Sequence, residues 1–411
     1  MPEFFTLVSP DDARTRFLEH IKPLGDVEEV ETSDALGRVT AEDITSPQVL
    51  PEFRRSTVDG YAVRASDTYG ASESLPAYLK LVGEVPMGRS TDITLSTGEL
   101  ALVHTGGMIP EGASAVVMIE NTQKTGDAEV EVRKPVAEGE NVINVGEDIQ
   151  PGDLILRAGH VIRAQDMGGL LAVGITGIRM ARQPRVAIYA SGDEVIPPAF
   201  ATEPGQVRDI NSYNVDTLVR QAGGIPMRLG ILPDNFDEML RQAQVAISEK
   251  HADMMVFSAG SSVSVRDVTA DVFQRLGSPG VLVHGVATKP GKPTILAVGD
   301  GRPLMGLPGN PVSAFVQFMM LGMAVIYRMQ GAEEPRHWPI RAKLTTNVAS
   351  VAGREDWLPT KLIERDGELY ADPIFFKSNL IFSLVQADGL LKIPLNKAGL
   401  EAGEMVEVRT L

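Results

Sequence analysis

The spacing of hydrophobic positions changes along the chain, and each spacing predicts a different kind of element. Near the N-terminus, Ala13, Phe17 and Ile21 recur at four-residue intervals after Pro10, which predicts a short amphipathic helix over residues 11–20. From about residue 46 to residue 146, short apolar runs such as YLKLVGEV and SAVVMIE are separated by Gly and Pro. This pattern indicates a compact all-β module without long helices.

A different rhythm begins at Pro184, where apolar runs without interior charge alternate with amphipathic helical stretches. This alternation is typical of a mostly parallel sheet that is covered by helices on both faces. Asp234 is predicted to cap the helix that follows it. The uncharged stretch 307–327 is predicted to be a buried helix, because Pro-Gly-Asn-Pro and Gln317 leave its apolar part too short for a membrane span. The predicted strands are RVAIYA, PMRLGIL, ADMMVFS, GVLVHGVA, TILAVG and PLMGL.

After about Gly331 the pattern returns to short strands, which predicts a small C-terminal β-barrel. The expected fold class is therefore multidomain α/β plus β: a central three-layer α/β domain with a mostly parallel sheet, a β-rich insertion module and a C-terminal β-barrel. Four domains are predicted, the first of them discontinuous: 1–45 plus 147–183, 46–146, 184–331 and 332–411.

Charge and composition narrow the range of possible functions. The 411 residues include 38 Lys and Arg against 54 Asp and Glu, for a net charge of −16. Such a surface repels phosphate backbones and anionic lipid, so binding to nucleic acid or membrane is not expected. The chain has no Cys, which excludes disulfides and thiolate metal sites and favours a reducing cytoplasm. The N-terminal stretch lacks the pattern of an export signal.

Three segments of the α/β region are suited to an anion. The strand PLMGL runs into Gly309, which allows close backbone approach, Asn310, a strong N-cap, and Pro311 at the first helical position. The helix that follows would direct free N–H groups at a ligand. Lys289 and Lys292 lie three residues apart in TKPGKP, and a Gly/Ser loop spans 258–264. Together they predict a phosphorylated or oxyanionic ligand.

A set of acidic residues could complement that anion. Carboxylates beside a phosphate site usually hold Mg²⁺, which neutralises repulsion between the oxygens. Each of these carboxylates could instead be a helix cap or a solvated surface charge. The six His residues form no metal-binding spacing, and structural or surface roles are expected for them, His104 included. The acidic candidates are Asp59, Asp148, Glu194, Asp234 and Asp267.

An ordered series of motifs resembles the molybdopterin molybdenumtransferase family, the MoeA proteins, whose eukaryotic relatives include the gephyrin E domain. The resemblance covers almost the whole chain. Its motifs, in order, are STVDGYAVR, HTGGMIPEGASAVVMIE, VGEDIQPGD, YASGDEV, ILPDN, SAGSSVSVRD, TKPGKP, GLPGNPVSA, GRED and KSNLIFSL.

The resemblance implies a Mg²⁺-dependent cytoplasmic transferase that completes molybdenum cofactor biosynthesis. It would insert molybdenum from molybdate, its substrate, into adenylylated molybdopterin and release AMP. It also implies a homodimer, with 1–45 plus 147–183 as the dimerisation domain and 184–331 as the molybdopterin-binding domain. Each active site would combine one subunit's α/β and C-terminal domains with the partner's β-rich module. Transient contacts with the adenylyltransferase and with molybdoenzyme acceptors are expected.

Carried over residue by residue, the resemblance also assigns roles. The implied catalytic residues are Asp59, Thr105, Asp148, Glu194 and Asp267. The implied metal ligands are Glu194, Asp234 and Asp267. The implied substrate-binding residues are Ser262, Lys289, Lys292, Pro293, Gly309, Asn310, Ser313, Arg354 and Ser378.

Two alternative functions stay open at this point. One is a molybdopterin adenylyltransferase, because the βαβ region resembles that enzyme, although it is a single smaller domain. The other is a non-enzymatic, gephyrin-like scaffold, although scaffolding in those relatives depends on additional domains.

Overall fold

The computed structural model describes residues 7–258 and 263–411, and for residues 263–267 only the backbone. The chain forms two compact units. The larger unit holds the described residues of Met1–Glu42, Arg157–Met167 and Thr176–Leu411. The smaller unit holds Asp43–Leu156 and Gly168–Ile175. Helix α2 (Ala164–Ala172) lies where the chain passes between the two units.

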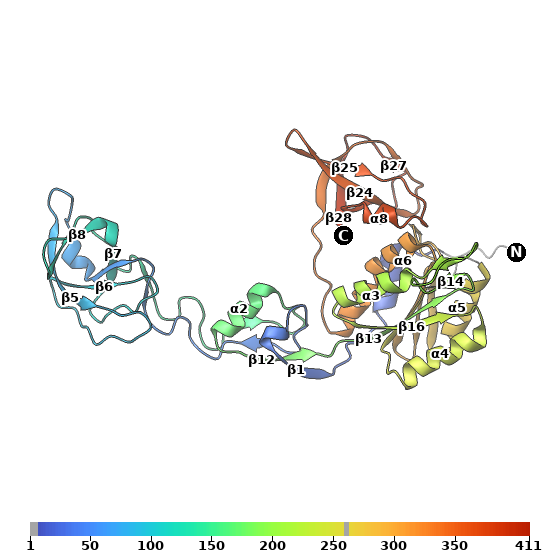
Figure 1. Ribbon diagram of the computed structural model, residues 1–411, viewed down its shortest axis with the longest axis horizontal. Coiled ribbons are helices and arrows are strands. Elements are labelled where there is room, and N and C mark those ends of the chain that lie inside the picture. Colours follow the sequence, from blue (N-terminus) through green and yellow to red (C-terminus); the bar gives the residue numbers. More distant parts are fainter. Residues whose placement is uncertain (1–6, 259–262) are drawn as a thin grey trace. The chain divides into compact units, whose positions relative to one another are not determined.

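A six-stranded sheet forms the centre of the larger unit (Figure 1). Its strand order is β16-β13-β17-β21-β20-β18. The first four strands pair in parallel, and β20 runs antiparallel to both of its neighbours. The predicted, mostly parallel sheet is therefore confirmed. Its strands are β13 (Arg185–Ser191), β16 (Ile225–Leu232), β17 (Met254–Ser258), β18 (Pro279–His284), β20 (Ile295–Gly299) and β21 (Arg302–Leu307).

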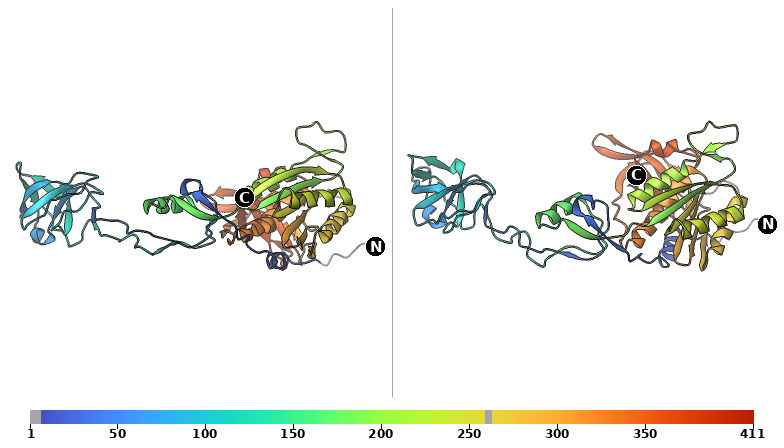
Figure 2. Two further views of the ribbon diagram at one scale, coloured as in Figure 1. Left: turned by 90° about the horizontal axis from the view of Figure 1, so that it is seen from below. Right: turned by 60° about the horizontal axis from the view of Figure 1, so that its bottom comes forward.

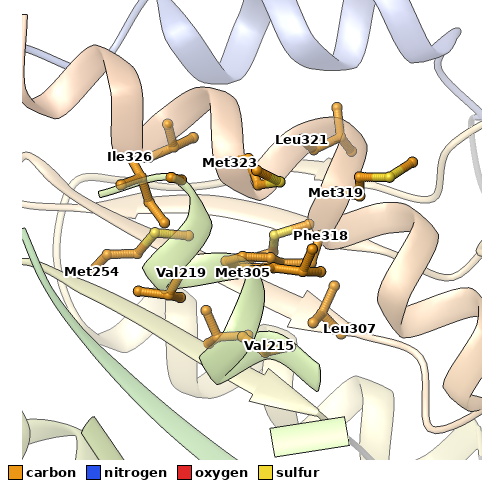
Figure 3. Close-up of a cluster of buried hydrophobic side chains, with 14 of the residues drawn as sticks. Val215, Val219, Met254, Met305, Leu307, Phe318, Met319, Leu321, Met323 and Ile326 are labelled. Carbon is orange, nitrogen blue, oxygen red and sulfur yellow. The ribbon is translucent and has the colours of Figure 1, made fainter. Parts of the chain in front are cut away.

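Helices cover both faces of this sheet, which explains why its strands are apolar throughout. In β13, Val186 and Ile188 belong to one buried cluster, whereas Ala187 and Tyr189 belong to another. Because side chains alternate across a strand, both faces need apolar residues. Figures 1 and 3 show α3 packed over one face, and Figure 2 shows the layers from two further directions. The covering helices are α1 (Pro10–Leu18), α3 (Asn211–Gln221), α6 (Pro311–Gln317) and α7 (Met323–Met329) on one face, and α4 (Phe236–Ser248) and α5 (Val263–Arg275) on the other.

The long apolar helix is a core helix, as predicted. Helices α6 and α7 join through the π-helical segment η4 (Phe318–Gly322) into one continuous stretch, Pro311–Met329. It is apolar and long enough to cross a membrane, but 83% of its apolar window is buried inside the protein. Figure 3 shows Phe318 and Ile326 packed with Val215 and Met305.

Two predictions about helix starts need correction. Asn235, not Asp234, caps α4, because the Asn235 side chain accepts a hydrogen bond from the Glu238 N–H at 3.0 Å. Asn310 does occupy the N-cap position of α6, and Pro311 follows it, but the Asn310 side chain makes no capping bond there. The spacing rules identified both neighbourhoods correctly, but the capping residue of α4 is one position later, and the Asn310 side chain bonds to Ser378, 68 residues away.

The C-terminal region of the larger unit closes into a five-stranded barrel, as predicted. The strand order β24-β25-β22-β28-β26 closes through the additional pairing of β24 with β26. Its other elements are β23 (Val348–Ala349), β27 (Gly399–Leu400) and α8 (Phe382–Val385). The barrel strands are β22 (Ile340–Leu344), β24 (Glu355–Arg365), β25 (Glu368–Pro373), β26 (Gly389–Ile393) and β28 (Met405–Thr410).

The smaller unit is built on a second six-stranded sheet of order β7-β4-β6-β5-β9-β8. Within residues 46–146, all of which are described, the only helical elements are the short 3₁₀ turns η2 (Ala65–Thr68) and η3 (Ile119–Asn121). The β-rich module is confirmed. Its strands are β4 (Gly60–Val63), β5 (Ala77–Glu84), β6 (Glu99–Val103), β7 (Ala115–Met118), β8 (Thr122–Lys124) and β9 (Glu129–Val132), with the short pairs β2 (Ile44–Thr45) with β11 (Leu154–Leu156) and β3 (Arg55–Ser56) with β10 (Val142–Ile143).

The predicted N-terminal helix and several short elements complete the larger unit. Helix α1 lies where the spacing predicted it, and Ser9 caps it by accepting from the Asp12 N–H at 3.1 Å. The other elements of the larger unit are the antiparallel pair β1 (Val27–Glu31) and β12 (Gly177–Ala181), the turn η1 (Thr32–Asp34), the pair β14 (Val195–Ile196) and β15 (Val207–Arg208), and β19 (Thr288–Lys289). The expected fold class is confirmed, and the four predicted domain boundaries stay a prediction.

Candidate functional site

A cavity of about 560 Å³ opens in the larger unit between the TKPGKP segment, the start of α6 and the barrel. It gathers seven of the predicted substrate-binding residues, which the sequence places in four separate segments. We call it the basic cavity. The predicted residues that line it are Lys289, Lys292, Pro293, Asn310, Ser313, Arg354 and Ser378.

A strand pairing brings the lysines to the barrel. Strand β19 runs parallel to the start of β24, with Thr288 opposite Glu355 and Lys289 opposite Asp356. The Glu355 N–H also donates to the Ala287 carbonyl at 2.9 Å. The spacing of the two lysines in TKPGKP did not predict this pairing. It fixes the lysine segment against the barrel by backbone hydrogen bonds.

A buried side-chain amide also anchors the lysine segment. The Gln317 side chain is 2% exposed and donates from Nε2 to the Pro290 carbonyl at 3.0 Å. A polar group inside an apolar helix is tolerated when it is hydrogen-bonded in this way. The turn beyond has no room for a side chain, because a Cβ on Gly291 (φ +109°) would lie 2.3 Å from Gln317 Cγ.

The barrel also reaches the start of α6. The Asn310 amide donates to Ser378 Oγ at 2.9 Å, and the Val312 N–H donates to the Ser378 carbonyl at 3.2 Å. One of the first-turn N–H groups that were predicted to be free for an anion is therefore occupied by the protein itself. Asn310 links two parts of the larger unit and does not cap its own helix.

The basic cavity is lined by one more cationic side chain than the motifs indicated. Lys377, adjacent to Ser378, lines it together with Lys289, Lys292 and Arg354. None of the described lining residues is Asp or Glu. The Thr288 hydroxyl, in a residue only 4% exposed, has no hydrogen-bond partner among the described residues. Sequence reasoning missed Lys377 and Thr288, because neither residue stands out by spacing or type.

Arg354 is held in a fixed orientation. Its Nε donates to Asp356 Oδ1 at 2.8 Å and its Nη2 donates to Asp356 Oδ2 at 3.2 Å. Asp356 is 2% exposed and also accepts from Ser350 Oγ at 2.8 Å. The guanidinium is thus aligned by a buried carboxylate and still lines the cavity.

A second cavity of about 670 Å³ shares Asn310 with the basic cavity. We call it the polar cavity. Glu194 and Gly309, both predicted, line it together with Ser191, Asn211 and Ser258. The Asn211 amide donates to Ser258 Oγ and to the Gly309 carbonyl, each at 2.8 Å. Asn211 Oδ1 and Ser191 Oγ are buried and have no partner among the described residues.

An acidic cluster lies at the carboxyl ends of β13 and β16. Burial, together with the charges of Asp193 and Glu194, raises the pKa of the Asp234 carboxyl above its usual value. Asp234 Oδ1 is also buried without a partner in the described part of the chain. These oxygens have the chemistry that Mg²⁺ prefers. The described side chains do not, however, form a group of three or more metal-binding residues ready to hold an ion.

The other predicted residues lie in the smaller unit. Asp59 Oδ1 accepts from the Thr105 N–H at 2.8 Å and from Thr105 Oγ1 at 3.3 Å. His104 Nδ1 lies 3.7 Å from the same oxygen, and its Nε2 lies 2.9 Å from Glu84 Oε1. Sequence reasoning gave His104 no site role, but it is next to a predicted catalytic carboxylate.

Asp148 borders a separate cavity of the smaller unit. This cavity has a volume of about 350 Å³ and is lined by Arg55, Glu147 and Asp148, among others. Arg55 Nε is buried and has no partner in the described part of the chain. Ser262 and the side chain of Asp267 lie outside the described residues, and their assignments stay predictions.

Comparison with known proteins identifies the family. A model of the MoeA N-terminal region (domain I and II) matches residues 8–174, one of a probable molybdopterin binding domain matches residues 187–328, and one of the MoeA C-terminal region (domain IV) matches residues 341–411. The chain belongs to the MoeA family. The resemblance that the motifs indicated is thereby confirmed.

Individual MoeA relatives match over nearly their full length. A putative molybdopterin biosynthesis protein of Methanocaldococcus jannaschii is 34% identical, covering 94% of this chain and 92% of the relative. The molybdopterin molybdenumtransferase of Bacillus subtilis is 31% identical, covering 97% and 93%. The crystal structure of a MoeA protein from Pyrococcus horikoshii OT3 has a TM-score of 0.84 at 32% identity, covering 99% of this chain and 100% of that one.

The raised pKa of Asp234 leads to a stability prediction. Asp234→Asn should raise the Tm of the metal-free protein at neutral pH, because the ionised carboxylate is disfavoured by burial and by its acidic neighbours. Like-charge crowding costs on the order of 0.5 kcal/mol, which corresponds to about 1–2 °C in Tm. This cost appears as pH rises above the unfolded-state pKa of about 4 and reaches its full size above the raised folded-state pKa. The gain in Tm should therefore grow as pH rises through this range and disappear below about pH 4.

Thermal unfolding followed by circular dichroism from acidic to neutral pH measures this gain. Asp127→Asn is the control, because it removes the same charge from an exposed turn. A Tm for Asp234→Asn at or below that of the wild type at neutral pH would contradict the prediction.

Proposed function

We propose that this protein inserts molybdenum from molybdate into adenylylated molybdopterin, with release of AMP, as the completing step of molybdenum cofactor biosynthesis. The observation that carries the proposal is the basic cavity: four cationic side chains and no described carboxylate line a pocket in a chain of net charge −16. Such a pocket concentrates an anion that the rest of the surface repels. The names of the relatives as molybdopterin molybdenumtransferases support the same reaction.

Each of the two cavities has a role in this proposal. The basic cavity would hold molybdate and the terminal phosphate of the pterin, through Lys289, Lys292, Arg354 and the hydroxyls that line it. The polar cavity, which shares the lining residue Asn310 with it, is large enough for a heterocycle and its diphosphate. The residues would bind and orient two anionic reactants side by side, which lowers the entropic barrier to their reaction.

Magnesium is part of the proposal. Glu194 and Asp234, with the predicted Asp267, would hold Mg²⁺, and the orphaned Asp234 oxygen supports this assignment. Mg²⁺ typically needs only one or two carboxylates when substrate phosphates complete its shell. When bound, it would neutralise charge on the diphosphate and so make AMP a better leaving group. Added Mg²⁺ should therefore raise the Tm of the wild type and leave that of Asp234→Asn unchanged.

The proposal extends to assembly and location. We infer a cytoplasmic homodimer in which Asp59, Thr105 and Asp148 of one copy complete the site of the other. All three lie in the smaller unit, whereas the basic and polar cavities belong to the larger one. The adenylyltransferase that supplies the substrate and the molybdoenzymes that accept the product would be transient partners. No observation favours the adenylyltransferase or scaffold alternatives for this chain.

Purified protein mixed with adenylylated molybdopterin, Mg²⁺ and molybdate should release AMP, as measured by chromatography. Lys289→Ala should reduce kcat/KM by about 10- to 100-fold, because a charge-assisted contact to an anion is worth roughly 1.5–3 kcal/mol. Asp267→Asn should abolish release and leave the circular dichroism spectrum unchanged. Lys361→Ala, at an exposed barrel position, is the control. If AMP is released without molybdate and without the protein, the proposed function is wrong.

A shared site predicts complementation between two inactive variants. Asp59→Asn and Asp267→Asn proteins should each be inactive, but mixed dimers formed by refolding or co-expression should regain part of the wild-type rate. One of the two sites in such a dimer would then be intact. Mixed dimers that stay as inactive as the parents would place both residues in the same copy's site, and a single-copy mass by light scattering would exclude the dimer.

A further inference from the structure

We propose that Asp356 is a positioning residue: it fixes which edge of the Arg354 guanidinium faces the basic cavity, so that the site recognises an oxyanion by geometry as well as by charge. The inference rests on the proposed function, because it takes a tetrahedral oxyanion as the ligand of that cavity. Asp356 itself is not among the residues that line the cavity, so it would act only through Arg354.

The hydrogen bonds from Arg354 to Asp356 determine which edge of the guanidinium is free for a ligand. Asp356 occupies the side edge of the guanidinium, with Nε and Nη2 donating at 2.8 and 3.2 Å. A guanidinium has five N–H donors in one plane. Both N–H groups of Nη1 and one of Nη2 are left over, and one N–H from each of these two nitrogens forms the end edge. Among the described residues no acceptor is bonded to Nη1. This end edge can grip two oxygens of one oxyanion in parallel.

Asp356 is itself held on two sides. Ser350 Oγ donates to its Oδ2 at 2.8 Å, and its backbone lies opposite Lys289 in the β19–β24 pairing. The side chain is 2% exposed. A carboxylate so enclosed cannot turn away from Arg354 without leaving its charge buried and unpaired, which is strongly unfavourable. The orientation of the guanidinium is therefore set before any ligand arrives.

The lysines and Arg354 therefore contribute differently to the charge of the basic cavity. Asp356 neutralises Arg354, so the pair contributes direction and little net charge. The net positive charge comes from Lys289, Lys292 and Lys377, whose ammonium groups are point charges without a fixed donor plane. A structural ion pair alone would not need to border a cavity, and buried ion pairs are weak sources of stability. The position of this one favours a role in recognition.

Equilibrium binding of molybdate to the full-length protein, measured by isothermal titration calorimetry without pterin, tests the inference. Asp356→Asn should weaken molybdate binding about tenfold, a change of about 1.4 kcal/mol. Arg354→Lys should weaken it at least as much, because an ammonium cannot form the fork. The double variant should bind no more weakly than Arg354→Lys alone, because Asp356 acts only through Arg354. Unchanged affinity in Asp356→Asn, or additive losses, would overturn the inference.

Chemical rescue separates positioning from a general structural role. Arg354→Ala should regain molybdate affinity when guanidinium is added at low concentration, and this rescue should be absent in the variant that also carries Asp356→Asn. Rescue that does not depend on Asp356 would overturn the inference. If Asp356→Asn does not fold, Ser350→Ala removes only the supporting hydroxyl and should weaken binding about two- to threefold with the Tm nearly unchanged. Full affinity in Ser350→Ala would then count against it.

The outcomes distinguish this inference from the proposed function. If the wild type does not bind molybdate at all, the oxyanion assignment of the basic cavity fails, and the proposed function fails with it. If the wild type binds molybdate and the Asp356 variant binds it equally well, only the positioning role fails.

Discussion

The parallel pairing of β19 with β24 is the constraint on which the candidate site depends. It places Lys289 opposite Asp356 and so joins the lysine segment of the α/β layers to strand β24 of the barrel. The contact of Ser378 with Asn310 and Val312 reinforces the same junction from the other side of the cavity. Without these contacts, the lysines and Arg354 would belong to two separately folded elements, and no rigid pocket would hold them together.

The electrostatics of the larger unit follow from this junction. Four cations line the basic cavity, whereas Asp193, Glu194 and Asp234 interact at the ends of two neighbouring strands. The polar cavity, which shares Asn310 with the basic cavity, is lined by Glu194 and Asp209 together with Arg208. A bound anion with its own cationic counter-ion would use both regions.

The sequence predicted what local rules control. Strands such as RVAIYA were recognisable because burial on both faces requires apolar residues at every position, and α1 because one helical face repeats every four residues. What it could not predict depends on partners far away in the chain. The hydrogen bond from Asn310 to Ser378 spans 68 residues, and the one from Asn211 to Gly309 spans 98. Asp356 and Arg354 are close in sequence, but only the fold shows that Arg354 lines a cavity together with the lysine segment.

The most direct test is to locate the metal. Crystals of the protein soaked in molybdate or tungstate, with data collected at the absorption edge of the metal, give its position by anomalous scattering. We expect a peak in the basic cavity, placed so that the oxygens around the metal lie within hydrogen-bonding distance of Lys289, Arg354 and Ser378. A fully occupied peak elsewhere, with the basic cavity empty, would contradict it.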